Sequence, residues 1–258
     1  MSGLSQETVQ KVLQDFTKTR LVEARVGDIL GIRGNIVQRV KDQLSGNFDE
    51  NLLKDQSEKK VSKAERCANM LKYQGWKLNK LLSRESKLLD VGSGNGEFAD
   101  ALSSKLGIEY TCLEKENSGY PVSVPKKGNL VLYGGSKFPF GNNTFSILTA
   151  MQLMHHIVDK LSFMEELFRV CVPYGYLIIQ DHNTTTMDDY IVLETVHTYY
   201  AVQENHVGCS EREILGRYMS AVHMIELAKE VGFRFVYSTH NNQHRHPGKH
   251  YYALFQKM

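Results

Sequence analysis

Three glycines at alternate positions, Gly92, Gly94 and Gly96, stand between a short apolar run and an amphipathic run. This order predicts a strand, a tight turn and a helix. Because glycine has no Cβ, such a turn lets a ligand come close to the backbone at the carboxyl end of the strand. The spacing is G-x-G-x-G, which differs from the G-x-G-x-x-G of loops that receive a pyrophosphate. The turn is therefore expected to hold a ligand without a phosphate cradle, although an ordinary glycine-rich turn has the same pattern.

Two carboxylates stand beside this turn in the predicted fold. Asp90 lies two residues before the first glycine, and Glu114 ends the next predicted strand, residues 110–113. An acid at the end of the second strand can accept hydrogen bonds from the ribose hydroxyls of a nucleoside. The separation of Asp90 and Glu114 suits one strand–helix–strand step. A ligand that carries a nucleoside is therefore expected, with an exposed loop glutamate as the alternative.

Histidines are the third group of candidate functional residues. His155 and His156 come shortly after a predicted strand, and His182 follows Asp181 at the end of another. An imidazole can contact a substrate or exchange a proton near neutral pH, and a hydrogen-bonded structural histidine is the alternative. Four more histidines lie in residues 240–250, but they lack a fixed ligand spacing, so the sequence predicts no metal site.

Residues 87–102, KLLDVGSGNGEFADAL, resemble the first motif of the class I S-adenosylmethionine (SAM) methyltransferases. A second resemblance lies in Phe138-Pro139-Phe140 and in the run from Met151 to His156, and together they cover residues 87–182. The resemblance implies a Rossmann-like α/β fold: a seven-stranded, mostly parallel sheet with helices on both faces, here with an N-terminal helical extension. It also implies SAM as the cofactor.

The resemblance assigns roles to residues of this chain. The implied cofactor-binding residues are Asp90, Gly92, Ser93, Gly94, Asn95, Gly96, Glu114, Lys115, Gly135, Ser136, Met151 and Gln152. His155 and His182 are the catalytic candidates, and His156, Asp181 and Tyr200 are the substrate-contacting candidates. One departure is clear, because Gly134-Gly135-Ser136 stands where the family has an acid for the adenine amino group. Backbone groups or the Ser136 hydroxyl are expected to take that part.

The composition of the chain limits which classes of protein are possible. The chain has 258 residues, 41% of them hydrophobic and 23% charged, with a net charge of +2, which favours a globular protein. We expect a helical extension over residues 1–85 and the methyltransferase domain over 86–258. Four cysteines without a C-x-x-C pair favour reduced thiols and a cytoplasmic location. No signal peptide or membrane span is expected, and the sequence does not define an oligomeric state.

Three functions remain open from the sequence. Lysines and arginines in residues 1–45 and 63–84 and in the last loop favour RNA as the partner and a cap position, such as guanine N7, as the acceptor. A looser resemblance to methyltransferases of large DNA viruses and to cap methyltransferases agrees with RNA capping by a viral protein. The alternatives are a small-molecule C- or O-methyltransferase of the quinone-biosynthesis type and a catalytically silent binding subunit.

Overall fold

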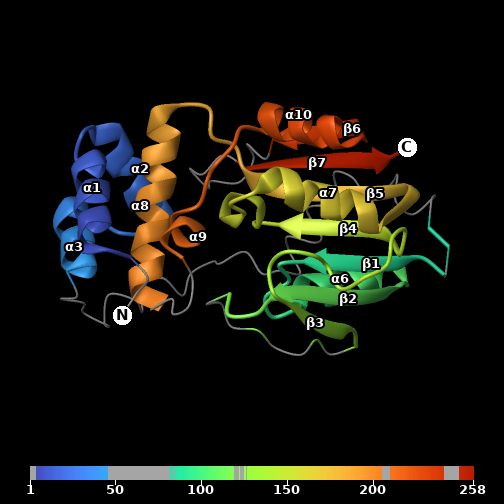
Figure 1. Cartoon of the computed structure of the whole chain (residues 1–258). Coiled ribbons are helices and arrows are strands. Elements are labelled where there is room, and N and C mark those ends of the chain that lie inside the picture. Colours follow the sequence, from blue (N-terminus) through green and yellow to red (C-terminus); the bar gives the residue numbers. More distant parts are fainter. Residues whose placement is uncertain are drawn as a thin grey trace.

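A seven-stranded sheet organises the molecule, with strand order β3-β2-β1-β4-β5-β7-β6 (Figure 1). We describe a computed structural model, which covers residues 4–45, 82–118 except 84, 122, 125, 127–204, 210–240 and 250–258. The predicted connection at 46–62, the predicted helix at 63–82 except its last residue, and most of the histidine-rich loop lie outside the described residues. Strands β1 to β5 are parallel, and β7 runs antiparallel to both β5 and β6. The predicted fold class is confirmed.

The strands and helices alternate through the sheet region, as a parallel sheet requires. The strands are β1 (Lys87–Val91), β2 (Glu109–Lys115), β3 (Asn129–Tyr133), β4 (Phe145–Met151), β5 (Cys171–His182), β6 (Phe233–His240) and β7 (His250–Lys257). The helices are α1 (Gln6–Phe16), α2 (Arg20–Leu30), α3 (Ile36–Leu44), α6 (Glu97–Leu106), the 3-10 turn η3 (Met154–His156), α7 (Lys160–Val170), α8 (Met187–Glu204), α9 (Glu211–Leu215) and α10 (Ala221–Val231).

Both faces of the sheet are covered by helices. Side chains of α7 and α10, such as Leu167 and Met224, are buried with one face of the strands. Side chains of α6, such as Phe98 and Leu102, are buried with the other face. The near-continuous apolar runs of the central strands follow from this burial on two sides. The loops at the carboxyl ends of the strands are therefore held by a rigid scaffold.

The N-terminal helices pack on α8 rather than on the sheet. Val22, Val26 and Leu30 of α2 share one buried cluster with Val192 and other residues of α8. Ser5, Thr19 and Asn35 cap the three helices, each accepting a backbone N–H through its side chain, as expected for these residue types. Figure 1 shows α1–α3 and α8 on the side toward which the β4 arrow points. The predicted boundary near residue 85 stays a prediction.

The long helix α8 is largely buried. Among the described residues, no helix combines the length and the apolar character needed to cross a membrane. Instead, α8 is buried on nearly all sides by protein. One side faces α1–α3, and another carries His197 toward the carboxyl ends of β4 and β5. The helix therefore connects the N-terminal helices to the region where a ligand of this fold binds.

Candidate functional site

The glycine turn after β1 has the conformation that its residue types favour. Gly92, Gly94 and Gly96 have φ of +69°, +57° and +73°, in the left-handed region that other residues rarely adopt. A Cβ on Gly92 would lie 2.7 Å from Cδ1 of Leu153, so the absence of a side chain is also required by space. The turn ends where α6 begins, with Gly96 as the N-cap.

The side chain of Glu114 points toward the glycine turn. Its Oε2 accepts a hydrogen bond from the backbone N–H of Gly94 at 2.8 Å, and the residue is 7% exposed. Asp90 is also buried, and its Oδ1 accepts the Thr149 hydroxyl at 2.6 Å. One oxygen of Asp90 is thus occupied within the protein. The Glu114 carboxylate is therefore placed where a bound nucleoside would lie. Asp90 instead links the end of β1 to β4 through its hydrogen bond with Thr149.

A small cavity adjoins these residues. It has a volume of about 80 Å³ and is lined by Gly92, Glu114, Lys115, Ser118, Tyr133, Leu153, His156, Ile157, Glu213 and Ile214. The volume is below the roughly 300–1,000 Å³ of sites for molecules of drug size. An ion pair between Lys115 and Glu213 of α9 lies across it. A larger hollow of about 520 Å³ lies at the opposite edge, beside Lys87 and Glu109, away from the carboxyl ends where such folds bind ligands.

One buried polar atom beside the glycine turn has no hydrogen-bond partner among the described residues. It is Nε2 of Gln152, just after β4. Gln152 has a φ of +57°, so the backbone is held in an uncommon conformation where β4 ends. Buried polar atoms are almost always paired, so this one fits a polar ligand at the end of β4. The residues present therefore suit a nucleoside-bearing cofactor.

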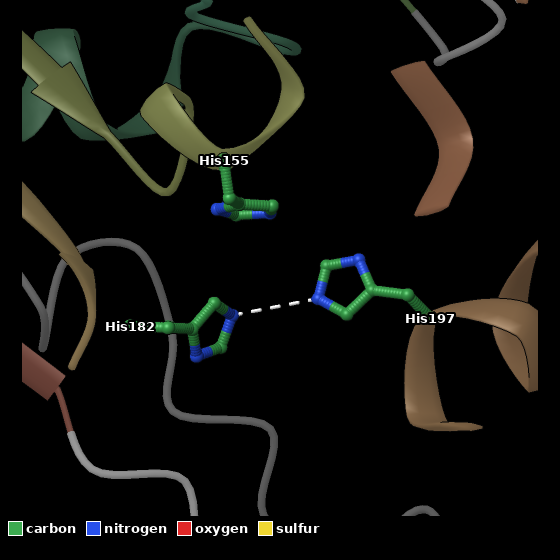
Figure 2. A group of neighbouring side chains, drawn as sticks. All are labelled: His155, His182 and His197. Carbon is green, nitrogen blue, oxygen red and sulfur yellow. Dashed lines mark hydrogen bonds between the residues drawn. The ribbon is translucent and has the colours of Figure 1, made fainter. Parts of the chain in front are cut away.

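Histidines from three elements meet beside this cavity. His155 of η3, His182 at the end of β5 and His197 of α8 have ring centroids 4.8 to 5.5 Å apart (Figure 2). His156 lines the cavity, and its ring lies 4.0 Å from that of His155. The ring of Tyr218 stacks on His155 with centroids 5.6 Å apart. The chain therefore gathers imidazoles at the carboxyl ends of β4 and β5.

Asp181 orients two of these histidines. It accepts hydrogen bonds from the Nδ1 side of His155 at 2.6 Å, the backbone N–H of His155 at 2.9 Å and that of His182 at 2.7 Å. Burial alone would raise the pKa of Asp181, but His155 and these hydrogen bonds lower it below its usual range. Burial, and then the neighbouring histidines, hold the pKa of His182 well below its usual value. His182 is therefore neutral at physiological pH.

The predicted site residues divide into two groups. The glycine turn, Glu114 and Lys115 surround the cavity or adjoin it, and the predicted histidines with Asp181 adjoin its His156 wall. Gly135 and Ser136 are exposed and do not line the cavity. Tyr200 packs with the cluster formed by α8 and the N-terminal helices. The individual roles of all these residues stay predictions.

Some residues at the site carried no clear signal in the sequence. Leu153, Glu213 and Ile214 line the cavity, although α9 was not predicted. The sequence assigns no role to His197 or Tyr218. Serine followed three residues later by glutamate, as in Ser210 and Glu213, forms a capping box here and could have revealed α9.

The strand order, the antiparallel β7 and the glycine turn after β1 define the fold as that of the class I SAM-dependent methyltransferases. Burkholderia thailandensis 1,6-didemethyltoxoflavin-N1-methyltransferase, solved with its substrate and S-adenosylhomocysteine, superposes with a TM-score of 0.52 at 13% identity, covering 85% of either chain. A SAM-dependent methyltransferase of Methanosarcina mazei superposes with a TM-score of 0.51 at 16% identity, covering 70% of this chain and 96% of that one. At such identities the likeness shows the fold.

A model of the family described as methyltransferase domain matches residues 55–238. The chain therefore belongs to the methyltransferase domain family, whose cofactor is SAM. An uncharacterised methyltransferase of Mycobacterium leprae is 31% identical over 96 residues, 36% of this chain and 35% of that protein. The demethylmenaquinone methyltransferase of Chlorobaculum parvum is 28% identical over 94 residues, 36% of this chain and 39% of that protein. The matches thus span little more than a third of these relatives.

Proposed function

We propose that this protein transfers a methyl group from SAM to a small-molecule acceptor. The observation that carries the proposal is the orientation of Glu114, whose buried carboxylate contacts the glycine turn at Gly94. A carboxylate in that place is suited to accept hydrogen bonds from the two hydroxyls of a ribose. Family membership over residues 55–238 supports the same cofactor.

The chain's own residues bind and orient, since SAM supplies the reactive methyl group on its sulfonium. Gly92 and Gly94 keep the turn free of side chains, and Glu114 would hold the ribose. Gln152 offers a buried side-chain nitrogen that has no partner among the described residues. The histidines beside the cavity lie where an acceptor would approach. An acceptor hydroxyl must also lose its proton, whereas an acceptor atom with a free lone pair needs no base.

The relatives favour a small acceptor over RNA. Besides the demethylmenaquinone enzyme, 27-O-demethylrifamycin SV methyltransferase of Amycolatopsis mediterranei is 26% identical over 103 residues. Both names describe methylation of small molecules. In the structure, Arg25 of the basic N-terminal region pairs with Asp189 of α8 at 2.9 Å, so this cation serves an internal contact. The RNA-cap and viral hypotheses stay predictions without support from these observations.

The cavity must widen when the cofactor binds. A volume of about 80 Å³ cannot take a nucleoside with an amino acid chain. The groups that fill the space needed by the cofactor are Leu153, Ile214 and the ion pair from Lys115 to Glu213. Because α9 has only five residues and Leu153 has a flexible side chain, a modest displacement of both is sufficient.

The test is a calorimetric titration with SAM, followed by methyl-transfer assays on quinols, phenols and amines beside capped RNA. The wild type is expected to bind SAM and to methylate a small molecule. Glu114→Gln is expected to weaken binding about tenfold to a hundredfold, as for loss of a charged hydrogen bond, because the amide accepts such bonds less well. The exposed Glu116→Gln is the matched control and should leave binding unchanged.

Two results would overturn the proposal. Absence of any binding heat with millimolar SAM would make the protein a silent module of the family. Methylation of capped RNA, with every small acceptor inert, would restore the RNA hypothesis.

A further inference from the structure

His155, His182 and His197 present ring nitrogens to one small region. One ligand atom from each of the three lies within 4.8 Å of the others. Figure 2 shows the three rings converging from three separate elements. His155 and His182 are more than nine-tenths buried. Neutral imidazole is a common ligand of transition-metal ions, so the three side chains have the ligand chemistry of such a site.

The hydrogen bonding of His155 leaves one nitrogen without a partner. Its Nδ1 lies 2.6 Å from Oδ1 of Asp181, so Nδ1 carries the proton and donates it. In the neutral ring Nε2 has a lone pair, and this buried atom has no hydrogen-bond partner among the described residues. A buried acceptor without a partner destabilises the folded protein. Coordination of a metal ion would satisfy it. A carboxylate that holds the far nitrogen of a ligand histidine is the usual outer partner in such sites.

The contact between His182 and His197 fits the same arrangement. Their Nε2 atoms lie 3.4 Å apart in a hydrogen bond, which an ion bound to both nitrogens would replace. With zinc–nitrogen bonds of about 2.0–2.1 Å, two ligands at a tetrahedral angle stand roughly 3.3–3.4 Å apart. The separation is therefore already that of two nitrogens on one ion. The nitrogens of the full set lie up to 4.8 Å apart, so His155 must move closer to the other two when an ion binds.

We propose that His155, His182 and His197 bind one divalent transition-metal ion of the zinc class, with Asp181 as the outer partner of His155. Three histidine ligands leave a fourth coordination position open. His156 lines the cofactor cavity, and its ring lies 4.0 Å from that of His155, so it stands between the cluster and the cavity. The ion would therefore lie on the acceptor side of the site. If the proposed methyl transfer holds, the open position is suited to an acceptor oxygen.

The sequence predicts no metal here, since the three histidines are separated by other elements and have no ligand spacing. Only the fold brings β4, β5 and α8 together at this point. The inference concerns binding alone and is independent of whether the protein transfers methyl groups.

The experiment uses the full-length protein, stripped with a chelator and titrated with Zn²⁺ by calorimetry without SAM. The proposal predicts one tight site per chain. Co²⁺ should give the intense visible absorption of a tetrahedral site. His197→Gln should lower the Zn²⁺ affinity by more than 100-fold, and Asp181→Asn by about 10- to 100-fold, as for an outer partner. His223→Gln is the matched control, because His223 is exposed on α10. The circular dichroism of each variant establishes that it is folded.

The histidine-rich loop supplies the decisive comparison. His244→Gln combined with His246→Gln should keep the tight site. Loss of the site in this double variant, with His197→Gln unaffected, would overturn the proposal. So would a stripped wild type that binds no Zn²⁺ and gives no tetrahedral Co²⁺ spectrum. SAM titration of the same stripped protein separates this result from a failure of the proposed function.

Discussion

At the residue scale, Gly92 combines two constraints that can be separated. Its φ of +69° is costly for any other residue, and a Cβ there would contact Leu153. Gly107 has a φ of +67° but no atom within 4 Å of its would-be Cβ. The pair therefore offers a measurement of the contact alone, with backbone strain held nearly constant.

We expect Gly107→Ala to lower the free energy of unfolding by about 1–2 kcal/mol, the cost of a left-handed alanine. Gly92→Ala should cost about 1–3 kcal/mol more, because Leu153 must move. It should also weaken SAM binding, since the displaced side chain enters the cofactor cavity. Urea unfolding and calorimetry measure the two effects. Equal losses of unfolding free energy in the two variants would contradict a role for the contact with Leu153. Adding Leu153→Ala to Gly92→Ala should remove the part of the loss that comes from this contact.

Two buried thiols give a second prediction at this scale. Burial raises the pKa of Cys112 and that of Cys171 to about 12. Because the thiolate is the reactive form, both residues should resist iodoacetamide at pH 8 in the native protein and react in urea. Peptide mass spectrometry reads out each site separately. Rapid native labelling of Cys112, which lies under Gly96, would show that the turn opens far more than the structure implies.

At the element scale, one aspartate joins the N-terminal helices to the start of α8. Asp189 is buried and accepts hydrogen bonds from Thr185, from Thr186 and from Arg25 of α2. Burial alone would raise the pKa of Asp189, but these bonds outweigh it and lower the pKa well below its usual value. A lowered carboxylate pKa stabilises the fold above the unfolded value of about 3.9 and loses that effect as the pH falls.

Asp189→Asn should therefore cost about 2–3 kcal/mol at pH 7, the range for hydrogen bonds to a charged group. Below about pH 4 the difference from the wild type should shrink, because the Asp189 carboxyl of the unfolded wild type takes up a proton there while the folded carboxylate stays ionised. Urea unfolding at a series of pH values measures this. Asp188→Asn, one residue away, is the control. A cost that does not change with pH would mean that the charge of Asp189 is unimportant.

The sequence was sufficient wherever the elements of the site are close in the chain. Gly92 to Gly96 and Glu114 belong to one strand–helix–strand step, so their residue types predicted their arrangement. His197 and Tyr218 join His155 only through the packing of α8 and the segment after α9, and no local pattern defines that packing. The role expected for Tyr200 illustrates the same limit. Because α8 is buried on nearly all sides, helical periodicity does not tell which face meets the site.

At the scale of the whole molecule, α8 carries the site histidine on one side and the N-terminal helices on the other. Ile191, Val192, Val196 and Tyr199 are all at least nine-tenths buried in the cluster with α1–α3. Burial of each such side chain contributes about 1.5–3 kcal/mol. The sum is comparable to the roughly 5–15 kcal/mol by which a whole domain is stable. The N-terminal helices are therefore expected to be part of the folding unit, whatever boundary the sequence favours near residue 85.

Removal of residues 1–45 tests this expectation. The shortened chain should bind a hydrophobic dye, unfold at a lower temperature and lose affinity for Zn²⁺, because His197 would no longer be held by a packed α8. A full-length chain cleaved at an engineered site between residues 45 and 82 is the control. Its two pieces should elute together and keep the native unfolding temperature, since the contacts with α8 are non-covalent. If the shortened chain instead unfolds at the native temperature without binding dye, the helices are an appendage, and the histidine cluster does not depend on them.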